Sequence, residues 1–169
     1  MRTLSLMIIA VCFALMGRNI ADSYKKRVSM LEKTEAMITL IRDEIDFCAL
    51  PINEMIHLIS QKESLKQLAF IEECYRFLSS GLDFPHAWNN SLEDRKNIAF
   101  LKKKDVDLLK SFGENLGITD SAGQLSKCNV YLGLLKINYN EALKDKERYS
   151  GLTTAIGFLV GLGVLIVFI

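Results

Sequence analysis

Histidines and neighbouring carboxylates are the residues of this chain whose types could do acid–base or metal chemistry. Neither His57 nor His86 has a Cys, Asp or Glu at the spacing typical of a zinc site. The carboxylate pairs Asp43–Glu44 and Glu72–Glu73 are adjacent in sequence, so on a helix their side chains diverge by about 100° and cannot share a substrate. We therefore interpret His57 as a packing residue and both pairs as solvated, and we expect no catalytic residue, metal site or cofactor.

Motifs for phosphate binding and covalent catalysis are also missing from the sequence. It contains no G-x-x-x-x-G-K-[ST] or G-x-G-x-x-G loop, no G-x-S-x-G elbow and no H-E-x-x-H helix. The formal net charge of +1 gives no support for a nucleic-acid partner. These observations favour a structural or interaction protein over an enzyme.

A few charged and aromatic residues could contact a partner protein. The basic run Lys102, Lys103 and Lys104 could bind an acidic partner or anionic lipid headgroups, although a solvated helix start explains it as well. Together with Glu114, these lysines are our candidate partner-facing residues. Trp88 is the single tryptophan, and we expect it to fill a gap between helices.

Two uncharged apolar segments lie at the ends of the chain. Residues 150–169 are predicted to be a transmembrane anchor, because about 20 residues at 1.5 Å rise cover the roughly 30 Å hydrocarbon core. Residues 1–21 are predicted to be a second, uncleaved anchor. A cleaved signal peptide is the alternative, but no A-x-A cleavage site follows the apolar run. The basic residues Arg18 and Lys25–Arg27 follow it instead, and such residues resist translocation across the membrane.

Positive charges predict on which side of the membrane the middle region lies. Lys25–Arg27 follow the first anchor, and Lys144, Lys146 and Arg148 precede the second. By the positive-inside rule, residues 22–149 form a cytoplasmic domain at the cell membrane. The cysteines include no C-x-x-C pair, which fits buried thiols in a reducing compartment.

Small residues four positions apart occur in both predicted anchors. Gly157 and Gly161 form a G-x-x-x-G motif, and Ala10 and Ala14 form a weaker counterpart. This spacing lets membrane helices approach closely, so these four residues are candidates for membrane-helix packing. The same spacing is also common in membrane helices that have no such interface.

The middle region is predicted to be an antiparallel helical bundle, which makes the protein all-α. Apolar residues at 28, 31, 38, 41 and 45 predict a helix that continues from the first anchor to about residue 49. Further helices are expected from Pro51, over 63–80 with Gly81 as the stop, from Pro85, from Lys102 to Gly117, and from Thr119 or Asp120 into the second anchor.

A resemblance to a known family is carried by segments that follow one another along the chain: Leu50–Met55, Phe77–Gly81, Ala87–Trp88, Phe112–Asp120 and Gln124. Over essentially the full length, the chain resembles the stage III sporulation protein AB family of endospore-forming bacteria. The resemblance implies a non-enzymatic platform in the mother-cell (outer forespore) membrane during engulfment. It would belong to a secretion-like complex between mother cell and forespore. Implied partners are a cytoplasmic ATPase like stage III sporulation protein AA, other membrane subunits and membrane lipid.

Gly113–Glu114 and Gly123–Leu125 more faintly resemble the cytoplasmic domains of type II secretion and type IV pilus platform proteins. Those proteins generally carry two such units and this chain has one, so a complete platform would require a homo-oligomer. Two other readings stay open. One is a membrane-tethered sensor or regulatory helical protein, and the other is an exported helical protein after signal cleavage.

Overall fold

The computed structural model describes the backbone of residues 2–47 and 50–168. Side chains are described for residues 12, 15–47, 50–149, 151–153, 155, 156, 159, 160 and 163. The chain divides into two units. One, which we call the terminal unit, comprises Met1–Val28 and Asn140–Ile169, and the other, the central unit, comprises Ser29–Tyr139.

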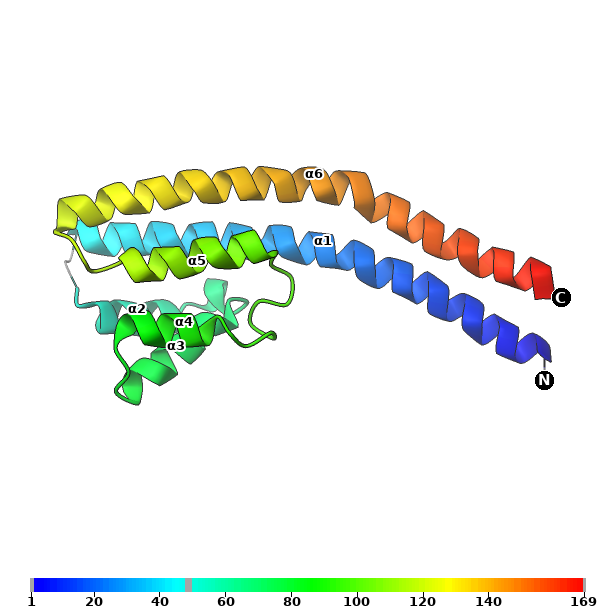
Figure 1. Ribbon diagram of the computed structural model, residues 1–169, viewed down its shortest axis with the longest axis horizontal. Coiled ribbons are helices and arrows are strands. Elements are labelled where there is room, and N and C mark those ends of the chain that lie inside the picture. Colours follow the sequence, from blue (N-terminus) through cyan, green and yellow to red (C-terminus); the bar gives the residue numbers. More distant parts are fainter. Residues whose placement is uncertain (1, 48–49, 169) are drawn as a thin grey trace. The chain divides into compact units, whose positions relative to one another are not determined.

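The secondary structure over the described ranges is helical, without strands (Figure 1). The elements are α1 (Arg2–Phe47), α2 (Ile52–Ser60), the 3-10 helix η1 (Glu63–Leu65), α3 (Ala69–Ser79), α4 (Phe84–Ser91), α5 (Lys103–Asn115) and α6 (Ser121–Phe168). The all-α prediction is confirmed. Helices α1 and α6 each contribute residues to both units.

Apolar residues on one side of α1 form the centre of the core of the central unit. Leu31, Ile38 and Ile41 are almost fully buried, and their spacings of seven and three residues place them on one side of the helix. Thr34 lies in the same stripe, where its hydroxyl donates to the carbonyl oxygen of Met30 at 2.8 Å. This bond satisfies the polar group, so the stripe excludes water.

The predicted continuous helix over 63–80 is wrong, because the structure divides it into η1 and α3. Leu65 ends η1 and Leu68 precedes α3, and both side chains are buried. The two leucines are three residues apart, a spacing that lies on one side of a 3-10 turn and of an α-helix alike, and they enter the core on the two sides of the break.

Helix ends follow the sequence closely. Gly81 has φ +95° and Gly117 has φ +83°, a left-handed conformation that glycine adopts without the Cβ penalty. Asp120 accepts a hydrogen bond from the amide of Gly123 at 3.0 Å, so it caps α6. Pro51 and Pro85 also lie at helix starts, one just before α2 and the other within the first turn of α4. These predicted boundaries are confirmed.

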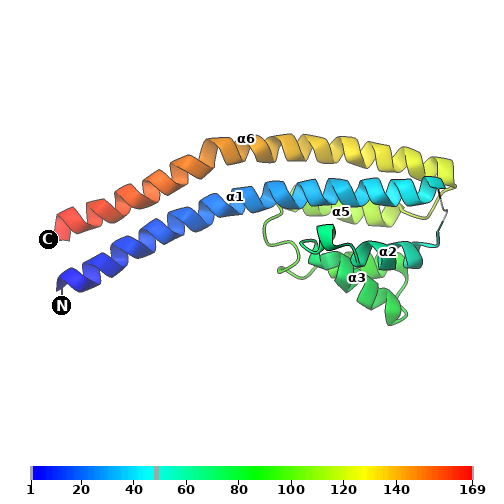
Figure 2. The same ribbon diagram turned by 180° about the vertical axis from the view of Figure 1, so that it is seen from behind.

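In the terminal unit, α1 and α6 lie side by side, as both views show (Figures 1 and 2). The rings of Tyr24 and Tyr149 stack with centroids 5.7 Å apart, and Arg27 contacts Asp145. Because the lower number on one helix pairs with the higher number on the other, the helices are antiparallel. Ala21 is buried on α1, where its small side chain permits close helix packing.

Over the described residues, none of the helices combines the length and the apolar character needed to cross a membrane. The candidate packing residues Gly157, Gly161, Ala10 and Ala14 belong to α6 and α1, but they lie outside the residues whose side chains are described. Their role in membrane-helix packing stays a prediction.

Candidate protein-interaction site

The basic run begins α5 and is exposed. Lys102 precedes the helix, and Lys103 and Lys104 are its first two residues. Asp105 behind them is fully buried, and its carboxylate accepts the backbone N–H of Lys102 at 2.9 Å. Cations at the N-terminal end of a helix oppose its dipole, and a carboxylate in the first turn offsets this cost. The carboxylate of Asp105 therefore stabilises the start of α5, which the positive charges of the lysines alone would destabilise.

Glu114 lies in the last turn of α5 and is exposed. Its carboxylate accepts a hydrogen bond from the side-chain amide of Asn89 at 3.3 Å. It follows Lys103 by about three helical turns, so the two residues share one side of α5 and are separated by roughly 16 Å along it. The three predicted lysines thus lie at the start of α5 and Glu114 lies at its end.

Trp88 fixes α4 against α5 from the inside. It is fully buried, and its indole N–H donates to the carbonyl oxygen of Leu109 at 2.8 Å. Three rings surround it, with centroid distances of 5.5 Å to Phe70, 5.6 Å to Phe84 and 5.9 Å to Phe112. The prediction that Trp88 fills a gap between helices is confirmed, and this cluster supports the exposed face of α5.

Gly113 is the point of closest approach between α5 and Trp88. A Cβ atom at this position would overlap the indole ring. The glycine therefore serves close packing, because its φ is not in the left-handed region that requires glycine. The adjacent residues Gly113 and Glu114 therefore have different roles: the glycine packs inward against Trp88, and the glutamate faces outward.

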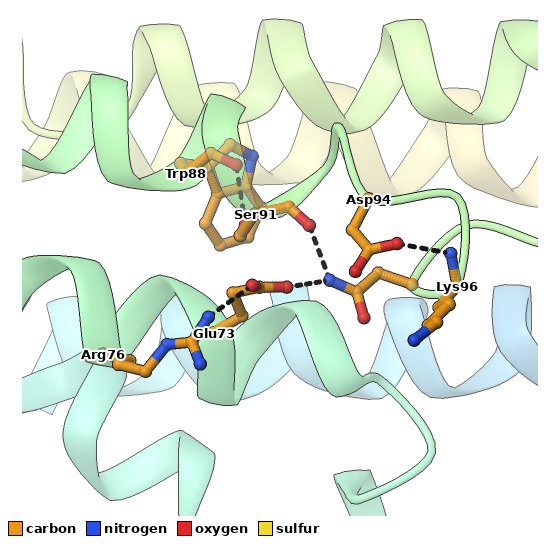
Figure 3. Close-up of polar contacts among 7 residues, drawn as sticks. Glu73, Arg76, Trp88, Ser91, Asp94 and Lys96 are labelled. Carbon is orange, nitrogen blue, oxygen red and sulfur yellow. Dashed lines mark hydrogen bonds and ion pairs between the residues drawn. The ribbon is translucent and has the colours of Figure 1, made fainter.

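A polar network ties the loop after α4 to α3 (Figure 3). Glu73 accepts hydrogen bonds from Arg76, at 2.6 Å, and from the side-chain amide of Asn97. The same amide donates to the carbonyl oxygen of Ser91 at 2.9 Å. Asn97 is buried and Glu73 is largely so, which means that our interpretation of Glu73 as merely solvated is wrong. A lone Asn in a loop gave no pattern from which this network could be predicted.

Both histidines have local partners. His86 contacts Asp83 at 2.8 Å, and this hydrogen bond lowers the pKa of the Asp83 carboxyl group. The ring of His57 lies 4.5 Å from that of Tyr75, as expected of a packing residue. Among the described residues, no group of three or more His, Cys, Asp or Glu side chains could hold a metal ion.

Cys74 and Cys128 are buried, as expected. Burial raises the pKa of the Cys74 thiol to about 12 and also raises that of Cys128. Both thiols stay protonated and unreactive near neutral pH. Cys48 lies outside the described residues.

The sensor alternative predicts a pocket with convergent polar groups. One hollow with polar lining residues lies beside α3 and has a volume of about 460 Å³. Its described lining residues all come from α3: Ala69, Glu72, Glu73, Tyr75, Arg76 and Ser79. Ligand sites usually form between elements, so this hollow does not favour the sensor.

Over the described residues, the fold and these contacts define an all-helical protein in which polar side chains such as Glu73, Asn97 and Arg27 pair within and between helices. The sequence model of the family described as stage III sporulation protein AB matches residues 2–169, so the chain belongs to that family. It is 27% identical over 168 residues to stage III sporulation protein AB of Bacillus subtilis (strain 168), covering 96% of this chain and 95% of that protein. No solved structure matches the chain.

The family resemblance seen in the sequence strings is therefore confirmed, and with it a role in sporulation. The family name indicates no enzymatic activity.

Proposed function

We propose that this protein is a non-enzymatic, membrane-anchored platform subunit of a secretion-like complex that links mother cell and forespore. Its terminal segments enter the mother-cell membrane and contact other membrane subunits. Its central unit faces the cytoplasm and docks an ATPase like stage III sporulation protein AA. Several copies assemble, because one chain has a single such unit.

The pairing of α1 with α6 in the terminal unit is the observation that carries this proposal. Arg27 is 3% exposed and donates to Asp145 at 3.1 Å, with Glu141 at 3.9 Å. A charge this deeply buried is tolerated when it is paired, and removing its partner is costly. The contact therefore keeps together the two helices that lead to the two ends of the chain. Paired ends of this kind support a double tether that enters one membrane from one side.

The charged side of α5 supports the docking part of the proposal. Residues with alternating charge follow one another on this side at helical spacing: Lys103, Asp107, Lys110 and Glu114. Such a face pairs with a complementary charge pattern on a partner, which gives specificity and raises the association rate.

Co-purification of the ATPase with the full-length, tagged protein from sporulating cells tests the docking proposal. We expect the wild-type chain to retain the ATPase and Lys103→Glu to retain at least fivefold less. Lys62→Glu is the matched control, because Lys62 is also an exposed lysine of the central unit but belongs to the segment between α2 and η1. No ATPase with wild-type protein, or equal loss in both variants with unchanged circular dichroism, would contradict docking through α5.

A further inference from the structure

An open groove runs between α5 and α6 on the central unit. Its volume is about 280 Å³, and its walls include Leu108 and Ser111 from α5 and Val130, Tyr131 and Leu134 from α6. The two helices are antiparallel here, because Ser111 contacts Tyr131 while Asn115, four residues later on α5, contacts Lys127. The groove is therefore open to a segment that lies along both helices.

The α6 wall of this groove is apolar and exposed. Val130 is 58% exposed and Leu134 is 43% exposed, and Ile137, one turn further along the same side, is 64% exposed. Positions i, i+4 and i+7 form a continuous stripe on a helix. Contiguous exposed apolar residues of this kind mark interaction sites more often than single ones do.

The floor of the groove is polar, but its groups bond one another. The hydroxyl of Tyr131 donates to the carbonyl oxygen of Ser111 at 2.9 Å, and it accepts from the side-chain amide of Asn115 at 3.1 Å. That amide also donates to the carbonyl oxygen of Ser111 at 2.9 Å. An occupant need not replace any of these hydrogen bonds, so apolar side chains can cover the floor without leaving it unsatisfied.

Positive charge lies at the ends of the groove. The ammonium of Lys127 contacts the backbone and side-chain oxygens of Asn115, both at 3.4 Å, and a lysine has a third N–H to offer. Lys104 lies on the same side of α5 as Leu108 and Ser111, four and seven residues before them along the helix. The described lining contains no Asp or Glu. The groove thus combines an apolar middle with a cation toward each end.

We infer that a partner protein inserts an amphipathic helix into the α5–α6 groove, with Asp or Glu residues at both ends of the helix's apolar face. Helices of this kind place side chains at i, i+3, i+4 and i+7 into apolar grooves. Carboxylates at the two ends would complement Lys127 and Lys104. The same groove of a second copy would instead bring like charges together. The inference rests on the proposed function only in that the central unit binds another protein.

A photo-crosslinking amino acid at Val130 of the full-length chain, in sporulating cells, tests this inference. Mass spectrometry then identifies the crosslinked peptide. We expect a peptide from another protein whose sequence forms an amphipathic helix flanked by acidic residues. Lys127→Glu should reduce the crosslink yield at least fivefold. Lys136→Glu is the matched control. Lys136 is also a lysine of α6 and is exposed, but it lies about 180° around the helix axis from Lys127 and therefore on the other side of the helix.

Leu134→Asp supplies a second variant should Lys127→Glu perturb the fold. A crosslink to another copy of the chain, to lipid or to a peptide without acidic flanks overturns the inference. So does the absence of any crosslink, or a yield that neither groove variant lowers. ATPase co-purification from the same cells separates the two proposals: retained ATPase without the crosslink rejects the groove occupant and leaves the platform role intact.

Discussion

Gly113 sets the distance between α5 and Trp88, and this contact is sensitive to a single methyl group. A Cβ at Gly113 would overlap the indole ring, which is itself fixed by Leu109 and by surrounding rings. Overpacking of a well-filled core costs about 1–3 kcal/mol. We therefore expect Gly113→Ala to lower the free energy of unfolding by about that amount, measured by circular dichroism on the full-length protein in detergent.

Gly133→Ala is the matched control for Gly113→Ala. Both glycines lie within helices, but a Cβ at Gly133 meets no atom within 4 Å. Alanine is favoured over glycine in a helix by up to about 1 kcal/mol, so this variant should be neutral or stabilising. Equal destabilisation by both variants would show that close packing at Trp88 is not the cause.

The buried thiols permit a prediction about pH. Because burial raises the pKa of Cys74 to about 12, its thiolate is scarce in the native state at any pH up to about 9. In a Cys12→Ser/Cys48→Ser variant, we expect Cys74 and Cys128 to react with a thiol reagent only after unfolding. Raising the pH from 7 to 9 should leave the native rate low. Rapid labelling of the folded protein that accelerates with pH would contradict this expectation.

In the terminal unit, Arg27 of α1 forms long-range ion pairs with Asp145 and Glu141 of α6. Replacing Arg27 with Met removes the buried cation and leaves Asp145, which is 20% exposed, without it. We expect Arg27→Met to lower the free energy of unfolding by about 1–3 kcal/mol, less than for a fully buried pair because Asp145 is partly hydrated. Arg27→Met combined with Asp145→Leu should recover part of this loss, since the double variant removes both charges of the closer pair.

Lys25→Ala provides the comparison for Arg27→Met. Lys25 contacts Asp22 at 3.1 Å on the same helix, but both side chains are exposed. The hydrogen bond from Lys25 lowers the pKa of Asp22, yet exposed pairs contribute little to stability. No measurable change is expected. A double Arg27/Asp145 variant as unstable as the two single losses added together would argue against coupling between these residues.

For the whole molecule, the proposed double tether predicts an orientation that reporter fusions can test. A fluorescent protein that folds only in the cytoplasm should be active when fused after Arg148, before the second apolar segment. Alkaline phosphatase, which needs an oxidising compartment, should be active when fused after Ile169 and inactive after Arg148. Phosphatase activity at Arg148 would instead support the exported alternative, because the central unit would then lie outside the cytoplasm.

Local features of the sequence determined most helix boundaries, because each depends on residues within a few positions. Gly81 and Gly117 permit left-handed backbone, and Asp120 accepts an amide N–H three residues ahead. Apolar spacing of three and four residues predicted the buried side of α1. The burial of Trp88 was also predictable, because a large ring in a short helix must cover apolar surface.

Tertiary structure decided the contacts between residues far apart in the chain. Glu73 and Asn97 are separated by 24 residues and Arg27 and Asp145 by 118, and each side chain alone looks like an ordinary polar surface residue. The break between η1 and α3, where Leu65 and Leu68 are both buried, has no Gly or Pro to mark it in the sequence. Sequence periodicity describes which side of a helix is apolar, but the partner of that side, and therefore which polar groups are buried and paired, depends on how the helices pack.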